Sequence, residues 1–169
     1  VEIRDRTEQA AAGGLALLLE ELHGMSGEAR AQRFAELAYA LSDCGSAREG
    51  GDLGDSPLDD TGSDIEQTVS RLSVWDLSEI LNTESGSHIF LRVPADYEVA
   101  ASVASSDPAV EYTTFWGEQR GLVPTMQYRT LQILAKHQGS ARQSSWRDPE
   151  GVEIRDRTEQ AAAGGLALL

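Results

Sequence analysis

The residues most able to do chemistry are one cysteine and one histidine, each in a distinctive context. Cys44 is the only cysteine and lies in the segment SDCGSA, and His88 closes the segment SGSH. A cysteine paired with a histidine can serve nucleophilic catalysis, as in a protease, if a base converts the thiol to a thiolate. The acidic loop that follows Cys44 disfavours a thiolate. Considered alone, Cys44 is typical of a small buried apolar residue and His88 of a hydrogen-bonded core histidine.

A basic segment is the second candidate for a binding function. Residues 136–147 contain no acidic side chain but four basic ones, Lys136, His137, Arg142 and Arg147, and Lys136 is the only lysine of the chain. A phosphate dianion would gain charge-assisted hydrogen bonds from Lys136 and Arg142. The alternative is a solvated basic loop that binds no ligand.

The overall charge excludes several classes of partner. The chain of 169 residues has 14 basic and 28 acidic side chains, which gives a formal net charge of −14. A nucleic-acid binder or a protein docked on an anionic membrane needs a basic surface, so we expect neither partner. A single cysteine excludes an intramolecular disulfide and fits a reducing compartment, cytoplasmic or nuclear. The longest apolar run, residues 10–19, is about half a membrane span, and no signal peptide is expected at the start.

The two ends of the sequence repeat each other. Residues 1–18 and 152–169 both read VEIRDRTEQAAAGGLALL, without a substitution. Three accounts are open: a circular permutant with overlapping ends, a window of a tandem array, or a residue order that differs from that of one native domain. In each of them, residues 152–169 can be followed by residue 19 onward.

Hydrophobic periodicity and turn residues predict the elements that must position these side chains. Helices are expected at residues 4–25, where Leu15, Leu18, Leu19 and Leu22 form an apolar stripe, at 28–41 and, shorter, at 65–72. Strands are expected at 79–82 and 88–93, joined by a turn at 83–86, and at 129–137. The remaining segments, 42–64, 94–108 and 138–151, are expected to be loops or linkers, and residues 110–128 receive no assignment.

Read in rotated order, residues 129–169 and then 19–93, the chain resembles a parvulin-type peptidyl-prolyl cis/trans isomerase. The segments TLQILAKHQGSARQSSWR, RFAELAYALSDCGSAREGGDLG and ESGSHIFLRV carry the resemblance, which points to the branch directed to phosphoserine- or phosphothreonine-proline. The resemblance implies an α+β fold, a four-stranded antiparallel sheet surrounded by helices in the order β-α-α-α-β-α-β-β.

The same resemblance divides the chain into three parts. Residues 1–93 would form the C-terminal part of the parvulin-like domain, 94–128 a linker and aromatic flank, and 129–169 the N-terminal part. A first strand so distant in the chain can pair within one molecule or in a domain-swapped oligomer.

An isomerase of this kind needs neither a metal nor a cofactor. The barrier to rotation about an X-Pro bond is about 20 kcal/mol, and it falls when an apolar, water-poor site favours the twisted amide. The resemblance places the catalytic floor on Cys44, His88, Thr83 and Ser85. Gln132 stands where the family has a first histidine, and an amide cannot take over the two-sided role of imidazole.

The resemblance also implies a proline pocket and a phosphate clamp. It assigns the pocket to Leu53, Thr61 and Ile65, and the polar Thr61 makes the pocket wetter than is usual in the family. It assigns phosphate binding to Lys136 and Arg142, since Ala141 replaces one of two paired arginines.

These features predict an isomerase of acidic or phosphorylated Ser/Thr-Pro bonds with a weakened active site, acting on proline-containing proteins or peptides. A non-catalytic parvulin module that binds phosphopeptides is the alternative. A helical scaffold unrelated to parvulins is a third reading, which would leave the matched segments unexplained.

Overall fold

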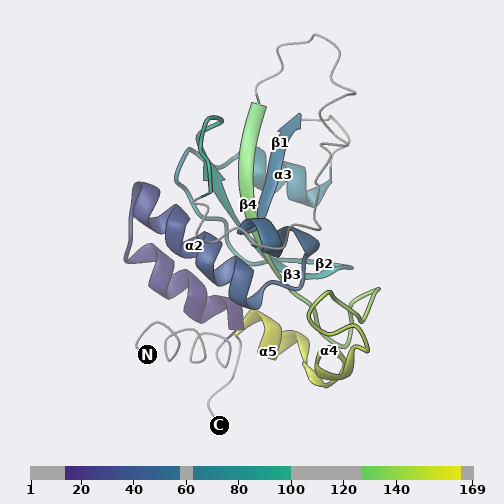
Figure 1. Ribbon diagram of the computed structural model, residues 1–169. Coiled ribbons are helices and arrows are strands. Elements are labelled where there is room, and N and C mark those ends of the chain that lie inside the picture. Colours follow the sequence, from purple (N-terminus) through teal and green to yellow (C-terminus); the bar gives the residue numbers. More distant parts are fainter. Residues whose placement is uncertain (1–13, 58–62, 100–126, 165–169) are drawn as a thin grey trace.

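An antiparallel sheet of four strands, covered by helices, forms the centre of the molecule (Figure 1). The computed structural model describes residues 14–57, 63–99 and 127–164. The strands are β1 (Asp52–Pro57), β2 (Leu81–Thr83), β3 (Gly86–Val93) and β4 (Gln127–Ala135), in the spatial order β1-β4-β3-β2. The helices are residues 14–23, α2 (Gly27–Leu41), the 3-10 helix η1 (Gly45–Glu49), α3 (Asp64–Ser70), α4 (Val152–Asp156) and α5 (Glu159–Ala163). The α+β fold implied by the resemblance is thereby confirmed.

Strand β4 occupies the middle of the sheet although it comes last in the chain. It pairs antiparallel with β1 on one side and with β3 on the other, where Ile133 lies opposite Ile89 and Leu131 opposite Leu91. Successive side chains of a strand point to opposite faces. The apolar residues Leu131 and Ile133 therefore face the core, and Gln132 between them faces the other side. The strand ends at Ala135 rather than at the predicted residue 137, so that Lys136 begins the basic loop.

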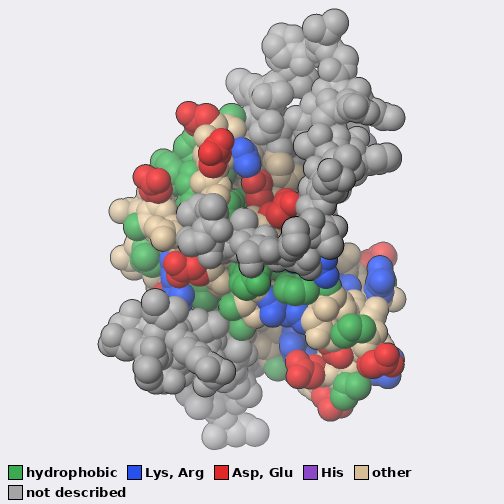
Figure 2. Space-filling model, in the orientation of Figure 1, with side chains coloured by type: hydrophobic (Ala, Val, Ile, Leu, Met, Phe, Trp, Pro, Cys, Tyr) green, Lys and Arg blue, Asp and Glu red, His purple; other side chains and the backbone are tan. Residues whose placement is uncertain are grey.

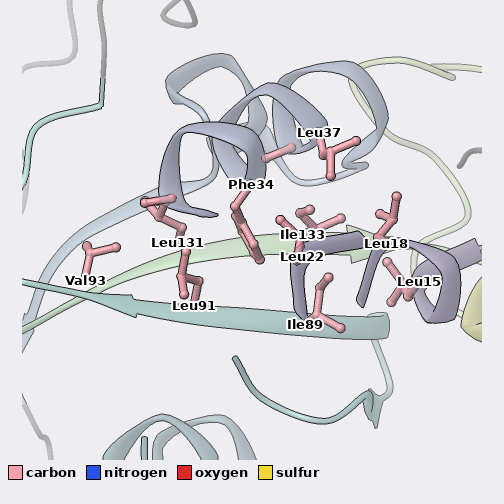
Figure 3. Packing of buried hydrophobic residues seen from close by; sticks show 12 residues of the cluster. Leu15, Leu18, Leu22, Phe34, Leu37, Ile89, Leu91, Val93, Leu131 and Ile133 are labelled. Atoms are coloured by element: carbon pink, nitrogen blue, oxygen red, sulfur yellow. The ribbon is translucent and has the colours of Figure 1, made fainter. Parts of the chain in front are cut away.

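The hydrophobic core lies between this sheet and two helices (Figure 3). In residues 14–23, leucines three and four positions apart share one face of the helix, as the sequence predicted. Figure 3 shows them packed with side chains of α2, β3 and β4. The largest labelled members are Leu15, Leu18, Leu22, Phe34, Leu37, Ile89, Leu91, Leu131 and Ile133, each at most 2% exposed. None of the helices in the described ranges is long and apolar enough to cross a membrane.

The expected loop at 42–64 contains two regular elements, so this prediction was wrong. Residues Gly45–Glu49 form η1, and residues Asp52–Pro57 form β1 on the edge of the sheet. The segment lacks the alternation of a half-buried strand, and its pairing with β4 is irregular between Asp52 and Asp55. Backbone pairing with β4, rather than its own hydrophobic pattern, makes this segment a strand.

The expected helix over residues 152–169 is broken into α4 and α5. Arg157 adopts an extended conformation, and the hydroxyl of Thr158 accepts a hydrogen bond from the amide of Ala161, which caps a new helix. The second helix ends at Gly164, whose φ of 86° belongs to the left-handed region that glycine tolerates. Residues 1–13, which hold most of the first copy of this segment and the first part of the predicted helix at 4–25, lie outside the described residues, as does most of the predicted linker.

The two copies of the repeated sequence meet in space. Figure 1 shows α5 ending beside the start of the helix formed by residues 14–23. The approach is close, because a Cβ added to Gly14 would lie 2.4 Å from the carbonyl oxygen of Ala161 and 2.7 Å from the nitrogen of Gly164. A helical turn from the second copy is therefore followed in space by residues of the first copy.

Candidate active site

A cleft of about 570 Å³ lies between the start of η1, the β2–β3 turn and the loop after β4. Four of the residues predicted for the site line it, and these are Cys44, Ser85, Lys136 and Arg142. They come from three segments distant in sequence. In Figure 2, basic side chains gather where the lobe that carries α4 meets the rest of the molecule. The structure thus brings the cysteine motif and the basic loop to one place.

The strand β3 positions His88 on the sheet face opposite the core helices. The pairing of β2 with β3 brings Thr83 to this histidine, and a hydrogen bond of 2.7 Å joins Thr83 Oγ1 to His88 Nε2. The rings of His88 and Phe90 stack with centroids 5.7 Å apart. The hydroxyl of Thr83 also accepts the amide of Ser85, which orders the turn at the edge of the cleft.

Burial determines the protonation state of His88. The side chain is almost fully buried, and this desolvation lowers the pKa of His88 below its ordinary value, while the nearby amide of Gln132 opposes the shift. Its Nδ1 atom has no hydrogen bond within the described part of the chain. The site therefore holds a neutral imidazole with one nitrogen fixed by Thr83 and the other unpaired.

Cys44 is held beside β4 through its neighbour Ser42. The amide of Cys44 donates to Ser42 Oγ at 3.3 Å, and the same hydroxyl accepts the amide of Leu134 at 3.1 Å. A main-chain hydrogen bond of 2.7 Å from Asp43 to the carbonyl of Leu134 reinforces this link. The half-buried thiol is thereby fixed at the mouth of the cleft beside an apolar side chain.

The basic loop folds back on itself and on the β2–β3 turn. The ammonium of Lys136 donates to the carbonyl of Ser144 at 2.6 Å, and the guanidinium of Arg142 reaches Ser144 Oγ at 3.3 Å. The amide of Ala141 donates to the carbonyl of Glu84 in the turn. These contacts place both predicted phosphate ligands on one wall of the cleft.

Trp146 is a site residue that the sequence analysis did not single out. Its ring lies between the guanidinium groups of Arg48 at 5.1 Å and Arg147 at 4.2 Å, and its indole nitrogen donates to the carbonyl of Ser42. Burial lowers the pKa of Arg147, which also donates to that carbonyl. The sequence signal for Trp146 is its place within the basic loop, directly before Arg147, because arginine side chains often stack on a tryptophan ring.

The predicted proline pocket is not assembled around this cleft. Leu53 on β1 and Ile65 on α3 are half-buried but do not line it, and Thr61 lies outside the described residues. Gln132 lies next to the start of β1, because its main-chain N–H donates to the carbonyl of Gly51 at 2.8 Å. Among the described residues there is no group of three or more histidine, cysteine or acidic side chains that could hold a metal ion.

Comparisons with known proteins relate this chain to one enzyme family. The profile of the PPIC-type PPIase domain, or rotamase, matches residues 3–93. The chain is 37% identical over 90 residues to the peptidyl-prolyl cis-trans isomerase Pin1 of Malus domestica, covering 53% of this chain and 70% of the relative. It is 38% identical over 86 residues to the Pin1 isomerase of Arabidopsis thaliana, covering 51% and 68%. No solved structure matches. The matched profile ends at β3, so β4 and the basic loop lie beyond it.

Proposed function

The chain belongs to the PPIC-type peptidyl-prolyl isomerase family, and we propose that its cleft acts on bonds in which an acidic or phosphorylated residue precedes proline. It is a peptidyl-prolyl cis-trans isomerase. The observation that carries the proposal is the convergence of Cys44, Ser85, Lys136 and Arg142 on one cleft. An anion at the basic wall would place the following proline toward the cysteine and the sheet.

The chemistry that we propose requires no covalent intermediate. The X-Pro amide loses its resonance as it twists, so a site that excludes water and bonds the twisted amide lowers the barrier. The apolar side chain of Leu134 and the half-buried thiol of Cys44 would offer a water-poor surface. The imidazole of His88 does not line the cleft, but it would act on its edge through Thr83, whose hydroxyl bonds both His88 and the amide of Ser85.

Local charge supports the preference for an anionic substrate. The chain carries a net charge of −14, which repels anions unless positive charge is concentrated nearby. Lys136 and Arg142 provide that concentration at the cleft, and a phosphate dianion can form charge-assisted hydrogen bonds with both.

Two replacements support a reduced rate of turnover. The resemblance implies that Gln132 stands at the position of the family's first histidine and Ala141 at that of a phosphate-binding arginine. His88 Nδ1 also has no hydrogen-bond partner in the described structure. These features favour the second candidate function, a phosphopeptide-binding module with little turnover.

We further propose that the chain holds the family's segments in rotated order, with residues 129–169 supplying the N-terminal part of the domain. The central position of β4 and the contact between Gly14 and the end of α5 support this order. The connection between these parts permits either closure within one molecule or a domain-swapped oligomer. The single cysteine supports a cytoplasmic or nuclear location.

Exchange NMR on three peptides, with phospho-Ser-Pro, Glu-Pro and Ala-Pro, tests the proposal. We expect acceleration in the order phospho-Ser-Pro, Glu-Pro, Ala-Pro. Lys136→Met and Arg142→Met should each weaken the phosphopeptide reaction about tenfold, the value of one charge-assisted hydrogen bond. Arg71→Met removes the same charge at an exposed position directly after α3 and is the matched control.

The outcomes separate the two candidate functions. Saturable phosphopeptide binding without acceleration at high protein concentration would favour the binding module. Absence of both binding and acceleration would rule out both functions.

A further inference from the structure

The second copy of the repeated sequence contributes a side chain to the edge of the cleft. Arg157, between α4 and α5, donates from Nη1 to Asp43 Oδ2 at 2.9 Å and to the carbonyl oxygen of Lys136 at 3.1 Å. Its own carbonyl oxygen accepts the amide of Gln138 at 2.8 Å. Arg157 therefore binds the start of the basic loop through both its side chain and its main chain.

Asp43 is the buried acceptor that Arg157 and the main chain of Lys136 share. Its side chain is only 4% exposed, and Oδ2 accepts the amide of Lys136 at 2.9 Å in addition to the guanidinium. A carboxylate so buried needs a compensating charge, and Arg157 forms an ion pair with it at 2.9 Å. Since Asp43 directly precedes Cys44, the pair connects the cysteine to the first residue of the phosphate-binding wall.

We propose that Arg157 is a positioning residue that fixes the distance between Cys44 and the anion-binding side chain of Lys136. The proposal rests on the proposed function, because it describes how the two sides of the same cleft are held at a fixed distance. Arg157 itself does not touch the substrate. Loss of the guanidinium would remove the ion pair of Asp43 and one hydrogen bond to the main chain of Lys136, leaving Asp43 with the Lys136 amide and the charge of Arg147 nearby. Anion and proline would then no longer be held at the spacing of one substrate.

The proposal also assigns this role to one copy of the repeat. Arg6 is the counterpart of Arg157 in an identical sequence. The second copy follows the basic loop directly, and Asp148 ties the two together by accepting the amides of Val152 and Ile154. Ile154 is fully buried, which anchors α4 against the molecule. This direct connection gives the second copy a high effective concentration at the site, an advantage that the first copy lacks.

The duplicated sequence supplies its own matched control. Arg157→Met and Arg6→Met make the same change in the same local sequence, and only the first should affect the cleft. For Arg157→Met we expect KM for the phospho-Ser-Pro peptide to rise about tenfold, since small misplacements of binding groups have effects of this size or larger. The rate with the neutral Ala-Pro peptide should change by less than about twofold, because that peptide does not use the basic wall. Arg157→Lys, which keeps a donor for Asp43, should recover most of the loss.

A second measurement does not depend on catalysis. Hydrogen exchange at the Lys136 amide, followed by NMR, should accelerate in Arg157→Met and remain unchanged in Arg6→Met. If wild-type protein accelerates no peptide, the proposed function fails while this measurement still tests the role of Arg157.

Three results would overturn the inference. One is an active wild type with no change in KM or amide exchange in Arg157→Met. Another is an equal effect of Arg6→Met, which would show that the copies share the role. The third is an equal loss with phosphorylated and neutral peptides that Arg157→Lys does not recover, which would indicate a merely structural role.

Discussion

His88 and Gln132 face the same side of the sheet, where the side chain of Gln132 opposes the lowering of the His88 pKa. Thr83 bonds one nitrogen of the imidazole, whereas Nδ1 has no partner among the described residues. A buried polar atom without a partner is costly, and the site gains if a side chain supplies one. The position of Gln132, opposite Phe90 on the neighbouring strand, is the natural place for such a side chain.

Gln132→His should therefore raise kcat/KM for the phospho-Ser-Pro peptide. An imidazole at this position can bond to His88, and one interaction of about 1.4 kcal/mol made in the transition state corresponds to tenfold in rate. Exchange NMR measures the change, with Gln132→Leu as the control that removes hydrogen bonding. An unchanged rate in Gln132→His would show that another feature, such as the proline pocket, limits turnover.

The lowered pKa of His88 predicts a pH dependence of stability. Because the folded chain keeps the imidazole neutral, acidification protonates the unfolded chain first. The contribution of His88 is fully present above pH of about 6.5, the ordinary pKa of histidine, and is lost as pH falls from there toward the lowered folded value.

Urea unfolding of the wild type and His88→Gln at pH 7.5, 6.5 and 5.5 measures this effect. The free energy of unfolding of the wild type should fall more steeply between pH 6.5 and 5.5 than that of the variant. Parallel curves would contradict the assignment of a neutral buried histidine.

Motifs around reactive residues predicted much of the site. Hydrogen bonds and ion pairs between residues distant in sequence could not be predicted from those motifs. The SDCGSA segment and the basic loop indicated Cys44 and Lys136, which the structure places on one cleft. Asp43 and Arg157 were not singled out, because an acidic residue in a loop and an arginine in a repeat have no distinctive spacing. Only the folded chain shows that they form an ion pair in which the carboxylate is buried.

At the scale of elements, Gly51 links the turn after η1 to the centre of the sheet. Its φ is 83°, and an added Cβ would lie 2.4 Å from the carbonyl oxygen of Gln132. The main chains of the two residues are also hydrogen-bonded, so this approach fixes the distance of β1 from β4.

Gly51→Ala should destabilise the fold by more than about 2 kcal/mol, since left-handed strain alone costs about 1–2 kcal/mol and the collision adds to it. Gly54→Ala is the matched control, because Gly54 has a φ of 70° and no atom within 4 Å of an added Cβ. Urea unfolding compares the two variants. Equal losses would show that the contact with Gln132 contributes nothing.

Elements with strong periodicity were predicted well, whereas those that depend on neighbours were not. The leucine stripe of residues 14–23 and the alternation in β4 correspond to the buried faces found. Strand β1 was missed because its segment DLGDSP is polar and irregular and becomes a strand only against β4. The break between α4 and α5 was missed because the Thr158 cap competes locally with a continuous helix.

For the whole molecule, the contact between Gly14 and Gly164 predicts that the segments can be joined in the other order. A chain that runs from Gln127 to Gly164 and continues from Gly14 to Val99 restores the repeated sequence AAAGGLALL at the junction. We expect this chain to form the same sheet and to be more stable, because the direct join closes a shorter loop.

Urea unfolding and exchange NMR on the rearranged chain check this expectation, and light scattering reports whether the parent and rearranged chains are monomers. A rearranged chain that fails to fold while the parent chain folds would contradict the rotated order.

The meeting of two identical copies at one helix has a consequence for how that helix is defined. Residues 14–18 and 165–169 have the same sequence, so either copy could supply the first turn of the helix at residues 14–23 without altering any side chain of that turn. The point at which one copy replaces the other, the crossover, is therefore not fixed by the sequence, because every position in the identical stretch is equivalent. A substitution in a single copy removes that equivalence and fixes the crossover on one side of it.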